Sequence, residues 1–219
     1  MNEFDDMKTT WYTPQGTMTN REKLIQLLVE RSFSRGQFIL SSGKSSDFYI
    51  DARMTTMSPE GLSILGPLAI DVIRQAGWNI DSVGGLTLGA DPLAYAISTS
   101  SNDFHPLIRA FTVRKETKTH GQGKLIEGPF KKGDRVVVVE DVITTGSSAI
   151  QAISAVLAAE GSVSGVLTVV DREEGGVDTI QKAGYHVIAL TTIQELMLYA
   201  NEHQASADVQ SNQDMSPLV

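Results

Sequence analysis

Short apolar runs alternate along most of this chain with longer stretches in which apolar residues recur every three or four positions. The runs, rich in β-branched residues, predict strands buried on both faces, and the longer stretches predict amphipathic helices. Regular alternation of the two favours parallel strands joined by crossover helices. We therefore expect an α/β fold with an open, mostly parallel twisted sheet and helices on both faces. The expected strands span residues 82–88, 107–113, 136–139, 162–170 and 186–190, and helices are expected to begin near residues 19, 58, 92, 149, 177 and 192.

The first part of the chain departs from this alternation. Two short apolar runs, residues 37–40 and 48–51, flank a polar connection that contains Gly43. This pattern predicts a β-hairpin, which we expect to lie outside the central sheet as a small hood. The last helix is expected to end at Asn201, before a polar tail. The expected divisions are a flexible tail (1–18), a single domain (19–203) made of an N-terminal helix and hood (about 19–57) and a core (about 58–203), and a flexible C-terminal tail (204–219).

The composition narrows the functional classes. A net charge of −8 argues against nucleic acid as the main partner, because a polyanion would be repelled. The chain has no cysteine, so it offers no disulfide, no thiolate metal site and no cysteine nucleophile. No apolar run reaches membrane-spanning length and the acidic N-terminus does not resemble a signal peptide. We expect no membrane partner, and a cytoplasmic protein is the default expectation.

Residues 136–148 carry the strongest chemical signal in the chain. Four valines are followed by Glu140 and Asp141, then by a loop rich in Thr, Gly and Ser that leads into a helix. A strand, a small-residue loop and a helix N-terminus together form an anion site. Two carboxylates beside a bare phosphate would repel it, whereas they would accept hydrogen bonds from the hydroxyls of an attached sugar. The stretch therefore predicts a site for a phosphorylated ribose. An acid pair alone would favour an ordinary strand end and helix cap.

A basic segment, residues 114–124, follows the expected strand that ends at Val113. It contains two glycines and no apolar periodicity, which predicts a long mobile loop. Alone it would be interpreted as a solvated loop, but beside a phosphosugar site it suits a lid that closes over a diphosphate. The glycines in residues 84–89 serve either close approach of a ligand or a tight turn, and the sequence leaves both open. Gly89, Arg114, Glu140 and Asp171 all follow strand ends, so a parallel sheet would gather them at one edge.

Residues 136–148 resemble the phosphoribosyl diphosphate (PRPP) signature of the type I phosphoribosyltransferases. The resemblance extends from about Ser32 to Asn201. Its most specific part is residues 114–121, which are similar to the catalytic loop of the family members that act on orotate. Residues 42–49 are similar to the hood of those members, and Asp171-Arg172 matches the position after their next strand.

This resemblance implies a Mg²⁺-dependent transfer of ribose 5-phosphate from PRPP to orotate, giving orotidine 5′-monophosphate and pyrophosphate in pyrimidine synthesis. It also implies a homodimer in which loop 114–124 acts in trans. The implied catalytic residues are Lys118, His120 and Asp141. The residues implied to bind PRPP are Arg114, Lys115, Lys118, His120, Glu140, Asp141, Val142, Ile143, Thr144, Thr145, Gly146, Ser147 and Ser148. The residues implied to bind orotate are Thr144, Arg172, Lys44, Phe48 and Tyr49. Mg²⁺ would be held mainly through PRPP, with Glu140 and Asp141 as candidate ligands.

The chain departs from the family pattern at three positions. Some members carry a lysine where Ser41 and Gly89 align here, and Glu140 replaces an Asp that is often first in the acid pair. Two alternative functions remain: a phosphoribosyltransferase for another nucleobase, and a PRPP-binding regulator. The basic loop and Arg172 favour orotate, because a planar guanidinium suits its carboxylate. A regulator that binds nucleic acid would need a basic recognition domain, and the first 35 residues are too few and too mixed in charge.

Overall fold

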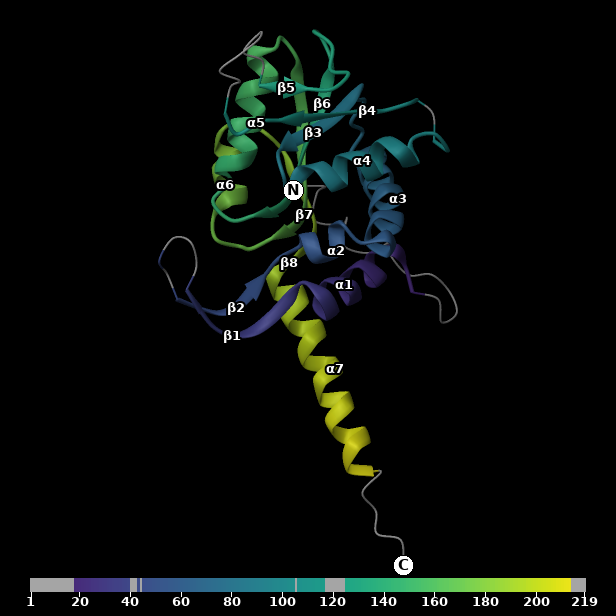
Figure 1. Ribbon diagram of the computed structural model, residues 1–219, viewed down its shortest axis with the longest axis vertical. Coiled ribbons are helices and arrows are strands. Elements are labelled where there is room, and N and C mark those ends of the chain that lie inside the picture. The colour runs from purple at the N-terminus through teal and green to yellow at the C-terminus, as the bar shows by residue number, and fades with distance from the viewer. Residues whose placement is uncertain (1–17, 40–42, 44, 105, 117–124, 214–219) are drawn as a thin grey trace, which may run out of the picture.

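A six-stranded sheet forms the centre of the computed structural model, which describes residues 18–39, 43, 45–104, 106–116 and 125–213, without the side chains of 204–213. The strand order is β5-β4-β3-β6-β7-β8, and every neighbouring pair is parallel except β4 and β5. The predicted fold class is therefore confirmed (Figure 1). The strands are β3 (Ser82–Leu86), β4 (Arg109–Val113), β5 (Ile126–Glu127), β6 (Arg135–Ile143), β7 (Ser162–Asp171) and β8 (Val187–Thr192).

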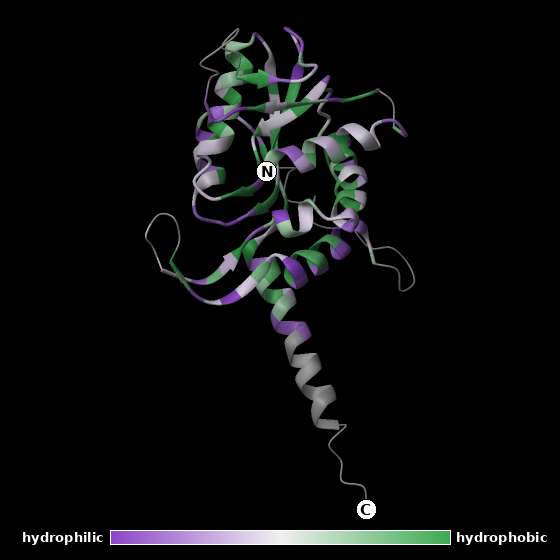
Figure 2. Cartoon of the chain, viewed as in Figure 1, coloured by the Kyte–Doolittle hydropathy of each residue, from purple (hydrophilic) through white to green (hydrophobic). Residues whose placement is uncertain are grey.

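Helices cover both faces of this sheet and form two hydrophobic cores. One core joins the sheet to α1, α3, α4 and α7, and the other joins it to α5 and α6. Alternate valines of β6 enter opposite cores, so the strand is buried on both faces, and Figure 2 shows hydrophobic residues along the central strands. The helices are α1 (Asn20–Arg31), α2 (Arg53–Thr56), α3 (Pro59–Gln75), α4 (Ala90–Ser100), α5 (Ser147–Ala158), α6 (Gly176–Lys182) and α7 (Ile193–Gln213).

The predicted helix starts at the N-terminal end of the chain are confirmed by their caps. Thr19 Oγ1 accepts the backbone N–H of Glu22, and the Glu22 carboxylate accepts the N–H of Thr19 in return. Ser58 Oγ accepts the N–H of Gly61, with Pro59 at the first helical position of α3. Each cap satisfies N–H groups that have no partner inside the helix.

The predicted hairpin is confirmed outside the main sheet (Figure 1). Strands β1 (Phe33–Ile39) and β2 (Ser45–Ile50) pair antiparallel and form a sheet of their own. Helix α1 ends at Arg31, and Phe33 opens β1, where its ring stacks on that of Phe48 with 6.1 Å between the ring centroids. The hairpin therefore begins earlier than its apolar runs indicated.

Three further elements differ from the predictions. Helix α7 continues to Gln213, past the predicted end at Asn201 and into the segment expected to be a tail, and it projects from the body (Figure 1). The backbone N–H and C=O groups of a helix bond to one another, so α7 can extend without an apolar face. The sequence of the extension therefore carried no apolar period that would predict it. The two-residue strand β5 and the four-residue helix α2 were not predicted, because neither is long enough to show a period. Within the described residues no helix is both long and apolar enough to cross a membrane.

Candidate functional site

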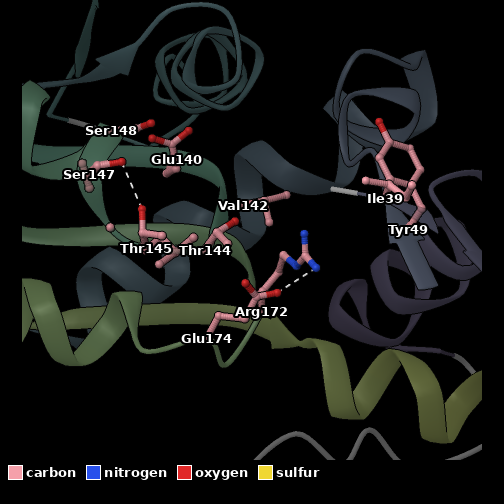
Figure 3. A pocket seen from close by; sticks show the side chains of 13 residues that line it. Ile39, Tyr49, Glu140, Val142, Thr144, Thr145, Ser147, Ser148, Arg172 and Glu174 are labelled. Carbon is pink, nitrogen blue, oxygen red and sulfur yellow. Dashed lines mark hydrogen bonds and ion pairs between the residues drawn. The ribbon is translucent and has the colours of Figure 1, made fainter. Parts of the chain in front are cut away.

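Two adjoining cavities lie at the carboxyl ends of the central strands, where parallel sheets bind ligands. The larger has a volume of about 560 Å³, and the smaller, about 290 Å³, shares six lining residues with it. The larger cavity is lined by Ile39, Tyr49, Glu140, Val142, Ile143, Thr144, Thr145, Gly146, Ser147, Ser148, Ala149, Arg172 and Glu174 (Figure 3). The smaller is lined by Tyr49, Ile50, Asp51, Ala52, Arg53, Leu86, Thr87, Leu88, Gly89, Lys115, Glu140, Asp141, Val142, Thr144, Ser148 and Arg172.

The loop between β6 and α5 forms an anion site at one end of the larger cavity. Helix α5 begins at Ser147, and no side chain in the described structure caps its first N–H groups. Gly146 before it has φ +81°, and a Cβ there would lie 2.7 Å from the carbonyl oxygen of Gly176. Only glycine meets both conditions without strain. The uncapped N–H groups, the helix dipole and the hydroxyls of Thr145 and Ser147 can together hold a phosphate (Figure 3).

Glu140 lies at the junction of the two cavities and is only 6% exposed. Burial, followed by the neighbouring Asp141 carboxylate, raises the pKa of Glu140 to about 9. Its Oε2 has no hydrogen-bond partner among the described residues. A buried acceptor without a partner is costly, so this atom is prepared for a donor that the ligand brings, such as a sugar hydroxyl.

Asp141 faces the smaller cavity and packs against the backbone of Gly89. Its Oδ1 accepts the N–H of Val142 at 2.9 Å, and a Cβ on residue 89 would lie 2.3 Å from the same oxygen. A side chain at position 89 would therefore displace this carboxylate. The structure thus gives a physical reason for glycine at the position where some family members carry a lysine.

Two other glycines of this region have a different role. A Cβ at Gly84 would lie 2.3 Å from the carbonyl oxygen of Phe111, and one at Gly85 would lie 2.1 Å from that of Val139. Both residues are inside β3, which is fully buried. They serve close packing against β4 and β6, rather than a tight turn or ligand approach, the two roles that the sequence left open.

Arg172 follows β7 and supplies a buried cation to both cavities. Its side chain is only 9% exposed, and its guanidinium carbon lies 5.2 Å from the centroid of the Phe48 ring. Nη2 lies 2.7 Å from Oε1 of Glu174, but the ion pair lacks the alignment of a hydrogen bond. Nε and Nη2 consequently have no hydrogen-bond acceptor within the described structure. Figure 3 shows Arg172 between the phosphate loop and Tyr49 of the hairpin, where it can receive a planar carboxylate.

The structure brings together most of the predicted residues that it describes. Phe48 lies beneath Arg172, and Lys115 lines the smaller cavity, with its carbonyl oxygen accepting a hydrogen bond from Gln151 on α5. Arg114 lines neither cavity, and its Nη1 lies 3.6 Å from Glu127. Lys44, Lys118 and His120 lie outside the described residues.

Several lining residues were missed by the sequence predictions. Glu174 could have been suspected from its place in the charged run after β7, but Ile39, Arg53 and residues 87–88 carry no local signal of their own. The hairpin brings Ile39 and α2 brings Arg53 to the cavities, whereas residues 87–88 reach them from the end of β3.

A divalent cation is compatible with this site only when substrate supplies oxygens. Among the described residues no three acidic or histidine side chains form a metal-binding group. Glu140 and Asp141 are adjacent carboxylates, and Oε2 of Glu140 has no other partner in the described structure. Mg²⁺ commonly binds through one or two carboxylates together with substrate phosphates, so these residues fit that arrangement.

The phosphate loop, the acid pair and the sheet order together define a phosphoribosyltransferase site. The family model for the phosphoribosyl transferase domain matches residues 56–188. The chain is 46% identical over 184 residues to the orotate phosphoribosyltransferase of Aquifex aeolicus, covering 82% of this chain and 99% of that one. It is 39% identical to the orotate phosphoribosyltransferase of Rhodopirellula baltica, covering 80% and 93%. The chain therefore belongs to the orotate phosphoribosyltransferase family.

Solved structures agree with this assignment. The orotate phosphoribosyltransferase of Mycobacterium tuberculosis in complex with Fe(III) dicitrate matches with a TM-score of 0.72 at 40% identity, covering 81% of this chain and 98% of that one. The same enzyme in complex with PRPP matches with a TM-score of 0.68 at 38% identity, with the same coverage.

Proposed function

We propose that this protein transfers ribose 5-phosphate from PRPP to orotate, giving orotidine 5′-monophosphate and pyrophosphate for pyrimidine nucleotide synthesis. One observation carries the choice of orotate. The buried guanidinium of Arg172 has two nitrogens without acceptors in the described structure, and it shares a cavity with the phosphate loop. A nucleobase that bears a carboxylate supplies the missing acceptors, whereas a purine without one would leave Nε and Nη2 buried without hydrogen-bond acceptors.

In the proposed complex the two substrates lie next to each other along the site. The uncapped N-terminus of α5 holds the 5-phosphate, Glu140 and Asp141 accept hydrogen bonds from the ribose hydroxyls, and Arg172 holds the carboxylate of orotate. The nucleophilic ring nitrogen of orotate forms the new bond to the anomeric carbon, while the bond from that carbon to pyrophosphate breaks and its electron pair leaves with the diphosphate. The negative charge of the Asp141 carboxylate favours the positive charge that develops on the sugar, and Glu140 adds to it when it is ionised.

The leaving diphosphate needs cations to stabilise its growing negative charge. We assign this role to Lys115 at the cavity wall, to Lys118 and His120 of the basic loop, and to Mg²⁺. When bound, Mg²⁺ neutralises charge on the phosphate oxygens and orients the diphosphate. Loop 114–124 would close over the substrate and exclude water. Its two ends are already joined by the hydrogen bond from Arg114 N–H to the Leu125 carbonyl oxygen.

A homodimer with the basic loop acting in trans is also part of the proposal. The exposed apolar side chains Met54, Met57 and Leu88 line a third cavity, of about 410 Å³, which shares Asp51, Arg53 and Leu88 with the smaller of the two cavities described above. Clustered exposed apolar side chains favour burial against a partner. We therefore place the second copy of the proposed dimer against this surface. The cytoplasmic location remains a prediction from the sequence.

The decisive experiment follows the loss of orotate absorbance with PRPP and Mg²⁺. We expect turnover by the wild type, severe loss of rate for Lys118→Ala, and wild-type rate for Lys132→Ala, whose exposed side chain pairs with Glu160. Equal rates for Lys118→Ala and the wild type would refute the assigned role of Lys118. Intact PRPP binding without orotate consumption would refute the proposed substrate, and a panel of other nucleobases would then identify it.

A further inference from the structure

Arg53, at the start of α2, is a cation of the smaller cavity for which the sequence predicted no role. Two parallel hydrogen bonds join the guanidinium of Arg53 to the carboxylate of Asp51 in a bidentate pair. Nε donates to Oδ1 at 2.8 Å, Nη2 donates to Oδ2 at 2.9 Å, and the backbone N–H of Arg53 donates to Oδ1 at 3.1 Å. A guanidinium fixed in this way loses little rotational freedom when a ligand binds.

The guanidinium remains accessible to a ligand. The Arg53 side chain is 45% exposed, and the bidentate pair engages only Nε and Nη2. Within the described structure no hydrogen bond or ion pair is formed by Nη1. The pKa of Arg53 is raised mainly by its hydrogen bonds with Asp51 and to a smaller extent by the negative charge of Asp141. Arg53 therefore keeps one nitrogen without a partner in the described structure, and it lines the same cavity as Asp141.

The substrate arrangement leaves one ligand group for the smaller cavity. The 5-phosphate and the orotate carboxylate both occupy the larger cavity, at the N-terminus of α5 and at Arg172. Glu140 and Asp141 hold the ribose between the cavities. The anomeric diphosphate would then enter the smaller cavity, which residues 87–89 and Asp141 also line. Apart from Arg172, which the orotate carboxylate would occupy, the cations described in this cavity are Arg53 and Lys115.

We propose that Arg53 binds the diphosphate group of PRPP in the smaller cavity, and that Asp51 positions its guanidinium for this contact. The inference rests on the proposed function, which supplies the substrate. The lysines that some family members carry at the positions of Ser41 and Gly89 are absent here. Arg53 supplies a cation to the same substrate group from another element of the fold.

The chain provides a matched control in Arg135, at the opposite end of β6 from Glu140. Asp81 holds Arg135 in the same bidentate pair, with Nε and Nη2 donating at 2.9 and 3.1 Å and the backbone N–H at 3.0 Å. The Arg135 side chain is likewise 45% exposed. In both pairs the arginine lowers the pKa of its carboxyl partner, that of Asp81 to about 2. The Arg53–Asp51 and Arg135–Asp81 pairs therefore have the same hydrogen-bond geometry, but only Arg53–Asp51 lines the smaller cavity.

The test compares Arg53→Gln, Arg53→Lys and Arg135→Gln in steady-state kinetics and in calorimetry with inorganic pyrophosphate and Mg²⁺. For Arg53→Gln we expect the KM for PRPP to rise on the order of tenfold, because a charge-assisted hydrogen bond is lost. Pyrophosphate binding should weaken by a similar factor, and the KM for orotate should not change. Arg53→Lys keeps the charge without the bidentate pair and should show a smaller rise. Arg135→Gln should retain wild-type values in every assay.

An Arg53→Gln enzyme whose KM for PRPP and pyrophosphate affinity equal those of Arg135→Gln would overturn the inference. If Arg53→Gln does not fold, as judged by its thermal melting curve, Arg53→Lys decides in its place, and unchanged values there would overturn it equally. Failure of the proposed function is a separate outcome. A wild type that consumes no orotate contradicts that proposal, while calorimetry with pyrophosphate still tests Arg53 because it requires no turnover.

Discussion

The two halves of the larger cavity are built in different ways. The phosphate half comes from one continuous segment, residues 140–148, in which a strand end, a loop and a helix start follow each other directly. The base half is assembled from the hairpin residue Tyr49 and from Arg172 and Glu174 after β7, with Phe48 supporting Arg172. Local geometry alone can create the first half, whereas the second exists only after the hairpin docks near the sheet edge.

The two halves also use different electrostatics. The phosphate half relies on backbone N–H groups at the start of α5, which tolerate many neighbouring side chains. The base half depends on one buried cation, Arg172, whose Nε and Nη2 lack acceptors in the described structure. A single substitution should therefore damage recognition of the base more than most substitutions would damage recognition of the phosphate.

The largest effect is expected for Arg172→Ala. Loss of the two charge-assisted hydrogen bonds should raise the KM for orotate on the order of a hundredfold. The KM for PRPP should change little, and steady-state kinetics with each substrate varied in turn would measure both. Arg172→Lys keeps the charge but loses the bidentate pairing and should be intermediate. An unchanged KM for orotate in Arg172→Ala would remove the contrast between the two halves.

On the phosphate side, Gly146→Ala should be compared with Gly133→Ala. Both glycines have left-handed φ values, +81° and +86°, but only a Cβ at Gly146 meets another atom, the carbonyl oxygen of Gly176 at 2.7 Å. Each variant should lose about 1–2 kcal/mol of unfolding free energy from backbone strain, and Gly146→Ala should lose more. Only Gly146→Ala should raise the KM for PRPP, because its loop must shift. Equal denaturation midpoints and equal KM values would contradict this prediction.

The buried acid between the halves predicts a pH dependence of stability. The folded-state pKa of Glu140 is raised from 4.5 to about 9, so the folded protein keeps a proton that the unfolded chain releases. The free energy of unfolding without ligand should therefore fall as pH rises from 4.5 to about 9, with a slope of at most about 1.4 kcal/mol per pH unit from this group. Denaturant titrations across this range should show a smaller fall for Glu140→Gln.

Glu60 is the control residue, because its pKa is shifted in the opposite direction from that of Glu140. Its hydrogen bond with Arg31 lowers the pKa of Glu60 from 4.5 to about 2, so its contribution is present above pH 4.5 and lost as pH falls toward 2. Glu60→Gln should alter the stability profile only in that acidic range. A Glu140→Gln profile parallel to that of the wild type from pH 5 to 9 would show that Glu140 ionises normally.

The smallest effect is expected for Phe48→Leu, which removes the ring beneath Arg172. Loss of a cation–π contact of about 0.5–1 kcal/mol should raise the KM for orotate about two- to fivefold. Phe104→Leu is the matched control, because Arg74 lies 5.0 Å from the Phe104 ring centroid in a similar contact. That variant should retain the wild-type KM for orotate. A KM for orotate that is unchanged in Phe48→Leu would show that the ring does not orient Arg172.

The predictions from sequence were best where the signal was local. The buried strand at residues 136–139, the capping box at Thr19 and the loop before α5 are each set by neighbours within a few positions, and the structure contains all three. Strand and helix alternation also predicted the parallel sheet, because short crossover connections allow few other topologies. The extension of α7 and the strand β5 were missed, since neither shows an apolar period.

The sequence by itself determined the fold class, the phosphate loop, the acid pair and the candidate basic residues. Only the tertiary structure placed Phe48 under Arg172, Arg53 in the smaller cavity and the Asp141 carboxylate against Gly89. The physical reason is the range of the interactions. A loop between a strand and a helix is specified by residues adjacent in the chain, whereas the burial of Arg172 and the space beside Gly89 depend on segments that meet only when the chain has folded.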